Sequence, residues 1–435
     1  MLFEHITVFT PEGVLKDRFV ATKGARIAYI GENRPAGDYG EAYDGHGKLL
    51  LPGFVNSHSH TPMTLMRGYG ENLVLSDWLN QRIFPFEAEM TGQDIYWASL
   101  LGIAEMVRYG ITSTTDMYTK LDDMARAFFE SGVKINLSNG AVNFNGAPYA
   151  ALNSTKETHA ALRDWHGAGD GRIRIDFSLH AEYTSDEATA RAVAEDAAKA
   201  GCRMHVHISE TRSEHEACKG RRNGRTPTQY LADCGLFDMP TTAAHCVWIE
   251  DIDRKILHEK GVTVASCPKS NLKLASGVFD TRSAIDTGVM VALGTDSVAS
   301  NNSLNMLEEL RTFLLVQKGF TGDPTLITPT EALLAATRIG ARAQGRDDCG
   351  EIREGYRADL AVLDISSPLM QPQHDLLANV GYTASGSDFV LTMCDGQVVY
   401  QDGAYPTIDI ERVVREVEAS RQRILGALAR KVDAH

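Results

Sequence analysis

The feature of the sequence that most restricts the fold is a regular alternation of short apolar runs and longer amphipathic stretches. Eight apolar runs begin at Leu49, Ile111, Val133, Ile173, Cys202, Thr241, Val262 and Val289. The stretches between and after them have helical periodicity, at residues 95–108, 122–129, 156–165, 185–199, 227–234, 251–259, 282–287 and 304–317. Apolar strands that alternate with helices are typical of a buried parallel sheet, because helices cover both of its faces. Eight such units predict an α/β fold of the (β/α)8 TIM-barrel type, with an open doubly wound sheet as the alternative.

The two ends of the chain have a different pattern. Residues 6–51 alternate in β fashion between turn signals, and the strings ADLAVLD (from Ala358) and FVLTMCDGQVVYQDG (from Phe389) are typical of strands, with Asp395-Gly396 as a tight turn. The simplest assembly pairs both ends beside the barrel. We therefore predict a small β-sandwich domain from residues 1–52 and 346–405, a barrel from residues 53–345, and a C-terminal helix within residues 406–435. A further helix is expected from Thr328, with Pro329 and Glu331 completing its start.

Composition limits the partners and the compartment. Lys and Arg minus Asp and Glu give 43 − 57 = −14, and an acidic surface argues against nucleic acid or anionic membranes as partners. We find neither a signal-peptide core nor an apolar run of membrane-spanning length. The seven cysteines are scattered without a CxxC pair, which suits a reducing compartment. We expect a cytoplasmic protein with no nucleic-acid or membrane partner. The composition does not determine the oligomeric state, and a homo-oligomer is possible.

Titratable side chains gather at the carboxyl ends of the predicted strands. They are His58 and His60 on the first strand, His207 on the fifth, His245 on the sixth and Asp296 at the end of the eighth. In a (β/α)8 barrel these ends form the catalytic face, and side chains two apart on a strand point the same way. A single histidine at a strand end is more often a packed core residue than a metal ligand. We interpret His205 as such a core residue. Imidazoles and a carboxylate from separate strands at one end indicate a site for zinc or iron(II).

Rival catalytic motifs are absent from the sequence. It contains no HExxH helix, no GxGxxG or GxxxxGK[ST] phosphate loop and no GxSxG nucleophile turn. The deaminases built on a cysteine-ligated zinc need an HxE…PCxxC signature, which Cys267-Pro268 does not supply. The histidine cluster is therefore the main indication of chemistry.

Several strings closely resemble motifs of the amidohydrolase superfamily. They are PGFVNSHSH, HVHISET, AHC, CPKSNLKLASG and GTDSVASNN. The branch most similar is that of the methylthioadenosine/S-adenosylhomocysteine deaminases, a group akin to cytosine deaminases and chlorohydrolases, and the resemblance runs through GYRADLAVLD over nearly the whole chain.

The resemblance implies a metal site with defined ligands. In it His58, His60, His207 and Asp296 would bind the metal, and His245 would hydrogen-bond the water that the metal holds. Other members of the superfamily hold two metals through a carbamylated lysine that ends the fourth strand. Here that strand ends in SLHAEY, with His180 and no lysine, so one metal is expected.

The implied reaction is the hydrolytic removal of an amino group from a purine-type ring. A metal ion lowers the pKa of bound water to about 7, which provides hydroxide at neutral pH. Asp296 would take the proton, and Glu210, three residues after His207, would protonate a ring nitrogen as a general acid. Without the resemblance Glu210 would be a solvated loop residue.

The resemblance also implies substrate-binding residues. Glu87 matches a position that binds ribose hydroxyls, Trp78 one that packs on the base and His180 one that hydrogen-bonds the purine; without the resemblance, Trp78 is an ordinary core aromatic and Glu87 a solvated helix start. Where homocysteine-binding members carry an arginine, this chain has Asn139. A buried carboxylate without a charged partner is costly, so S-adenosylhomocysteine is expected to be a poor substrate.

Adenosine, methylthioadenosine and deoxyadenosine are therefore the small-molecule substrates that fit best. Two alternatives remain open. One is an aminohydrolase or chlorohydrolase that acts on another heterocycle, such as guanine, a pterin or a triazine. The other is a scaffold protein on an inactive barrel, although such proteins usually lose metal ligands and none is missing here.

Overall fold

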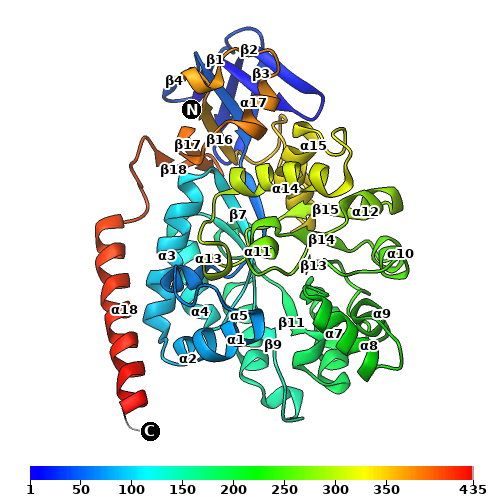
Figure 1. Ribbon diagram of the computed structural model, residues 1–435. Helices are drawn as coiled ribbons and strands as arrows, with labels where there is room; N and C mark the ends of the chain where they lie inside the picture. Colours follow the sequence, from blue (N-terminus) through cyan, green and yellow to red (C-terminus); the bar gives the residue numbers. More distant parts are fainter. Residues whose placement is uncertain (434–435) are drawn as a thin grey trace.

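A computed structural model describes residues 1–433 of the chain (Figure 1). Its parallel strands are β6 (Phe54–Ser59), β7 (Ile111–Met117), β8 (Lys134–Ser138), β9 (Gly140–Ala141), β10 (Ile173–Ile175), β11 (Phe177–Ala181), β12 (Met204–Ile208), β13 (Thr241–His245), β14 (Thr263–Ser266) and β15 (Met290–Leu293). Helices lie between these strands, as the alternation predicts. The mixed α/β class is thereby confirmed.

The parallel strands form two sheets, and each edge of one sheet lies next to an edge of the other. One has the order β10-β8-β7-β6 and the other β15-β14-β13-β12-β11-β9. A single residue, Asp176, separates β10 from β11, and a parallel bridge joins Ser59 of β6 to Asp296 after β15. Because all of these strands run the same way, their carboxyl ends meet on one side of the molecule.

The helices that cover the strands begin and end close to the predicted residues. They are α3 (Gly92–Arg108), α4 (Leu121–Ser131), α5 (Asn153–Trp165), α7 (Glu187–Ala200), α9 (Pro227–Asp233), α10 (Asp251–Glu259), α12 (Thr281–Thr287) and α14 (Met306–Thr321). Their apolar stripes explain the packing: in α4, Leu121, Met124, Ala125 and Phe128 are buried at the i, i+3, i+4 and i+7 positions. Helix α8 (Arg212–Arg221) was not predicted.

The helix expected from Thr328 is present. It begins as α15 (Pro329–Leu334), with the capping box of Thr328 and Glu331 formed. It continues through a π-helical turn (Ala335–Ile339) into α16 (Gly340–Ala343).

Both ends of the chain build a third sheet, at the top of Figure 1. Its strands are β1 (Leu2–Thr10), β2 (Gly13–Lys23), β3 (Arg26–Gly31), β4 (Ala42–Asp44), β5 (Lys48–Pro52), β16 (Leu360–Asp364), β17 (Phe389–Cys394) and β18 (Gln397–Gln401). The order is β18-β17-β16-β5-β1-β2-β3, with β4 beside β1, so the antiparallel pair of β5 and β16 joins the two chain ends.

The apolar run from Leu49 is two strands rather than the single strand that its hydrophobicity predicts. In β5, Leu50 faces the core of the end-built sheet, whereas Leu49 and Leu51 face the core of the parallel strands. The run is apolar throughout because both faces of β5 are covered. Gly53 separates it from β6, and a Cβ at that residue would lie 2.2 Å from the Thr112 hydroxyl.

The last described element is α18 (Ile410–Asp433), which packs along α3 and buries Val413 and Ile424. Residues 434–435 of the predicted C-terminal part lie outside the described residues. Within residues 1–433, no helix combines the length and apolar character that crossing a membrane requires.

Candidate active site

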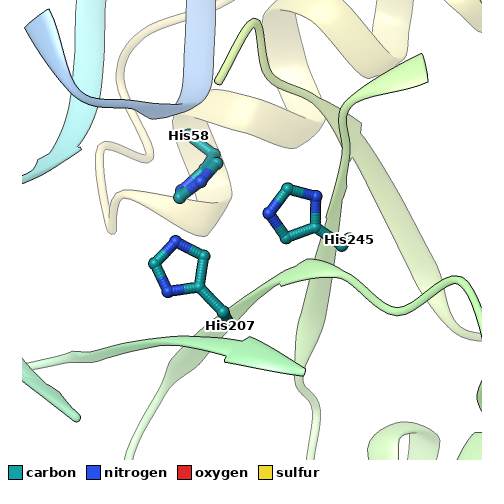
Figure 2. Close-up of side chains that lie close together, drawn as sticks. All are labelled: His58, His207 and His245. Atoms are coloured by element: carbon teal, nitrogen blue, oxygen red, sulfur yellow. The ribbon is translucent and has the colours of Figure 1, made fainter. Parts of the chain in front are cut away.

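The structure brings the five strand-end side chains together. His58 and His60 come from β6 and the residue after it, His207 from β12, His245 from β13 and Asp296 from the segment after β15. Figure 2 shows the rings of His58, His207 and His245 converging from three strands, and the centroid of His58 lies 4.9 Å from that of His207 and 5.3 Å from that of His245. Two sets of their ligand atoms lie close enough together to hold a metal ion: His58, His207 and His245, and His58, His60 and Asp296.

Hydrogen bonds fix which nitrogen of each imidazole is free. His60 Nδ1 donates to the carbonyl of Met117 (2.5 Å), and His207 Nδ1 donates to the carbonyl of His180 (2.7 Å). In a neutral ring of this kind Nε2 is the nitrogen with the lone pair, and the two Nε2 atoms lie 3.3 Å apart. Burial lowers the pKa of His58 to about 3, so the His58 ring is neutral at pH 7. Its Nε2 is buried without a hydrogen-bond partner.

A divalent cation would satisfy these lone pairs. Asp296 Oδ1 lies 3.4 Å from Nε2 of His58 and 3.4 Å from Nε2 of His60. The other carboxylate oxygen, Oδ2, already accepts hydrogen bonds from the hydroxyls of Ser270 (2.5 Å) and Ser300 (2.9 Å). Three imidazoles and one carboxylate oxygen are ligands typical of zinc or iron(II), and each has a second partner that orients it. The donor set fits one metal ion.

Glu210 and His245 lie beside this cluster. His245 Nδ1 donates to Asn271 Oδ1 (2.9 Å), and its Nε2 lies 3.8 Å from Glu210 Oε2. Glu210 Oε1 accepts a hydrogen bond from the Ser276 hydroxyl (3.2 Å). Burial raises the pKa of the Glu210 carboxyl, which favours the protonated form that a general acid needs.

The backbone at the site adopts conformations that are rare for residues other than glycine. Ser209, His245 and Asp296 have φ angles of +47°, +69° and +60°. Each follows the regular part of a parallel strand or ends it. Such strain concentrates at functional sites, where the surrounding contacts hold it in place.

The cluster opens into a cavity of about 410 Å³, a volume typical of small-molecule sites. Trp78, Glu87 and His180, the three predicted substrate-binding residues, all line it. Glu87 accepts a hydrogen bond from the Tyr118 hydroxyl (2.6 Å), and burial raises the pKa of its carboxyl. The Nδ1 atom of His180 is buried without a hydrogen-bond partner.

The ionisable residues that line the cavity are acids and histidines. Carboxyl groups and imidazoles line it, but none of the described lining residues is a lysine or an arginine. Asn139 also lines it, and its amide donates to Glu157 (2.8 Å). The cavity therefore offers no permanent cation to an anionic group of a ligand.

Sequence reasoning missed residues that orient the predicted ones. His205, interpreted as a packed core residue, lies with Nε2 2.9 Å from Nδ1 of His58. Ser270 and Asn271 lie in the string CPKSN and Ser300 lies in GTDSVASNN. Both strings were recognised as family motifs, so they could have pointed to these orienting residues. For Tyr118, which contacts Glu87, no such signal existed.

A cluster of strand-end imidazoles and a carboxylate that opens into a ligand-sized cavity is typical of metal-dependent hydrolases on parallel α/β folds. The model of the amidohydrolase family matches residues 49–399, and the chain belongs to this family.

Similar proteins narrow the comparison. The chain is 38% identical over 418 residues to a 5-methylthioadenosine/S-adenosylhomocysteine deaminase from Dictyoglomus thermophilum, covering 96% of this chain and 97% of the relative. It is 37% identical over 427 residues to a 5'-deoxyadenosine deaminase from Methanothermobacter thermautotrophicus, covering 97% and 99%. A solved structure of an adenosine deaminase from Xanthomonas campestris with bound zinc superposes with a TM-score of 0.91 at 31% identity, covering 98% of each chain. The predicted resemblance is confirmed.

Proposed function

We propose that this chain is a metal-dependent aminohydrolase that removes the amino group of an adenosine-type nucleoside, such as adenosine, methylthioadenosine or deoxyadenosine, and releases ammonia. The observation that carries the proposal is the pair of Nε2 atoms of His60 and His207, 3.3 Å apart, beside Asp296 and Glu210 in one cavity. Relatives 37–38% identical over nearly the full chain are named as deaminases of such nucleosides, which supports the substrate class.

The strand order supports a closed barrel as the scaffold. We infer that β6, β7, β8, β10 with β11, β12, β13, β14 and β15 form the eight strands of a (β/α)8 barrel, since the bridge between Ser59 and Asp296 links the first strand to the last. Residues 53–345 would form this barrel, residues 1–52 and 346–405 a small β-sandwich domain, and the chain from residue 406 the C-terminal part that contains α18.

The metal would be held by His58, His60, His207 and Asp296, as one ion, with zinc favoured and iron(II) as the alternative. When bound, such an ion lowers the pKa of a water molecule to about 7 and so provides a nucleophile at neutral pH. Asp296 accepts a proton of the attacking water, because its Oδ1 faces the cluster while Oδ2 is held by serines. His245 orients that water, and Glu210 gives its proton to a ring nitrogen. The proton on Asp296 then passes to the amino group, which leaves as ammonia, and the remaining hydroxyl proton of the added water returns to Glu210 as the carbonyl forms.

Three side chains of the cavity wall suit a nucleoside. Glu87 can accept from two ribose hydroxyls, Trp78 can pack on the base, and the unpartnered Nδ1 of His180 can hydrogen-bond the purine. The lack of a lysine or arginine among the described lining residues disfavours S-adenosylhomocysteine, because its carboxylate would lose hydration without gaining a charged partner.

The proposal also includes the setting of the enzyme. A small molecule is the partner, and no nucleic acid is involved, given the net charge of −14. All seven cysteines are unpaired and buried, which agrees with the reducing cytoplasm expected for the protein.

Ammonia release is the direct test. Zinc-loaded protein is assayed with adenosine, methylthioadenosine, deoxyadenosine, guanine and pterins, and the three nucleosides are expected to give the highest kcat/KM. Failure to turn over any of these compounds would remove the proposal. Bound metal well below about one equivalent, together with no turnover, would favour a scaffold on an inactive barrel.

Glu87→Ala separates the nucleoside from other amino-heterocycles. Hydrogen bonds to a charged acceptor contribute about 1.5–3 kcal/mol, so the variant should raise KM for a nucleoside roughly 10–100-fold. KM for a free base or a triazine should not change. Tyr118→Phe is the control, because it removes the protein partner of Glu87 and leaves the carboxyl in place. An unchanged KM for every nucleoside in Glu87→Ala would favour the alternative substrates.

A further inference from the structure

The segment that carries Glu210 is a tight turn rather than a continuation of the strand. Strand β12 ends at Ile208, and Ser209 adopts a left-handed conformation with φ of +47°. This conformation turns the chain, and Glu210 then lines the cavity. Because a serine at positive φ is strained, other groups must hold the turn.

The carboxylate of Glu214, on the first turn of α8, is the main partner of this turn. Its Oε1 accepts from the backbone N–H of Ser209 (3.0 Å), and its Oε2 accepts from the N–H groups of Glu210 (2.9 Å) and Thr211 (3.4 Å). In an ordinary capping box the glutamate reaches only the N–H of the N-cap residue, here Thr211. Three successive N–H groups converge on one carboxyl and form a concave site that this chain fills with its own side chain, and burial raises the pKa of that carboxyl to about 7.

The side chain of Glu210 is itself loosely held. Its described contacts are the hydrogen bond from Ser276 at 3.2 Å and the His245 ring nitrogen at 3.8 Å. Its orientation therefore depends on the backbone of the turn. Glu214 also lines the cavity, but both of its oxygens accept hydrogen bonds from the backbone, which hold its carboxyl against the turn.

We propose that Glu214 is a positioning residue for the proposed deamination: its carboxylate fixes the turn of residues 209–211 so that the Glu210 carboxyl faces the ring nitrogen. This inference rests on the proposed function. Ser209 supplies a second anchor, because its hydroxyl is hydrogen-bonded to Nδ1 of His215 (3.0 Å). Glu214, unlike His215, accepts a hydrogen bond from the backbone N–H of Glu210 itself.

The first test compares two capping boxes of the same type. Glu214→Ala should lower kcat about 10²-fold with little change in KM, because a misplacement of about 1 Å costs that much in rate. Glu331→Ala is the matched control: Glu331 accepts from the N–H of Thr328 (2.7 Å) in the capping box of α15 and does not line the cavity. Both variants should lose thermal stability, and only Glu214→Ala should lose kcat. An unchanged kcat in folded Glu214→Ala overturns the proposal.

The second test asks whether Glu214 acts through Glu210. Substitutions that act through one group are not additive, so adding Glu214→Ala to Glu210→Gln should lower the residual kcat no further. A multiplicative loss in the double variant overturns the inference.

A structure of Glu214→Ala keeps the inference separate from the proposed function. Ser209 should leave the left-handed region or Glu210 should turn from the cavity, and this readout needs no substrate. If the parent protein turns over no amino-heterocycle, the proposed function fails. If the turn is unchanged without the Glu214 carboxylate, the positioning role fails.

Discussion

The two ends of the parallel strands are both polar and buried, but they are built in opposite ways. At the carboxyl ends lies the candidate metal centre, formed by His58, His60, His207 and Asp296. Nearer the strand starts lies a second group, here termed the strand-start network, which consists of Lys134, Asn136, Asp176, Gln344, Arg346 and Asp359. The candidate metal centre places the Nε2 atoms of two imidazoles opposite each other, whereas the strand-start network places donors opposite acceptors.

Each charged group of the strand-start network has a partner. The Lys134 ammonium contacts the carboxylates of Asp359 and, at 2.8 Å, Asp395. The Arg346 guanidinium donates to the carbonyls of Gly171, Ile135 and Arg172. No side-chain nitrogen or oxygen of the network is among the buried unpartnered atoms of the described residues, whereas His58 Nε2 is.

The difference between the two ends indicates which of them stabilises the fold and which serves activity. Buried polar groups in a folded protein are normally satisfied, and the strand-start network follows this rule. The candidate metal centre does not follow this rule, because the buried Nε2 of His58 has no hydrogen-bond partner, and a bound cation would supply one. Departures from such rules are expected where function requires them, so the network should govern the free energy of unfolding and the centre should govern activity.

The largest effect is expected from Asp296→Asn. The substitution removes a proposed metal ligand that is also the proposed proton acceptor, and general acid–base catalysis alone contributes about 10²–10⁴-fold. We expect kcat/KM to fall by at least roughly 10³-fold and the bound zinc to fall below one equivalent, as ammonia release and metal analysis would measure. The thermal midpoint of the metal-free protein should change little. A variant that retains full activity would contradict the assignment of the centre.

Lys134→Met tests the other end. Breaking a buried ion pair on one side costs about 3–5 kcal/mol, because here two carboxylates lose their cation while the side-chain volume is kept. Urea unfolding should show this loss, and KM of the folded protein should stay unchanged.

The control is Lys260→Met, because Lys260 pairs with Asp238 on the surface, where the two side chains are 42% and 60% exposed. Exposed pairs contribute at most about 1 kcal/mol. If the two lysine variants lost the same stability, the strand-start network would not differ from a surface pair.

The two ends also differ in how far the sequence predicts them. The proposed metal ligands follow from local patterns: strand periodicity placed His58, His60 and Asp296 at strand ends, and a family resemblance assigned their roles. The contacts of Lys134 with Asp359 join residues 225 apart in the chain, and no local pattern encodes them. The break at Gly53 was missed for the same reason, since it depends on Thr112 packing against the glycine.

Helix α8 was missed for another reason. Of its side chains only His215 and Cys218 are buried, so the apolar stripe that predicts a helix is too narrow to recognise. Its start is nevertheless signalled by the capping box of Thr211 and Glu214, the same pattern that placed the helix after Thr328 correctly.

The smallest predicted effect concerns Glu309, a buried carboxyl that has hydrogen-bond donors around it. It accepts from the amide of Asn301 and from the backbone N–H of Lys269 (3.1 Å), while the ammonium of Lys269 contacts Glu308 instead. Burial raises the pKa of Glu309 to about 8. The folded protein therefore keeps a proton on this carboxyl between its ordinary pKa of 4.5 and about 8, where the unfolded chain has lost it.

Stability must fall as pH rises through this range, because the folded state binds more protons than the unfolded state. The slope from one group is at most about 1.4 kcal/mol per pH unit. Glu309→Gln keeps a neutral side chain of similar shape, so its free energy of unfolding should fall less than that of the parent between pH 5 and pH 8, as urea titrations at several pH values would measure. Glu308→Gln, at the neighbouring residue, should keep the parent slope. Equal slopes for Glu309→Gln and the parent would mean that Glu309 is ionised in the folded protein and would contradict the prediction.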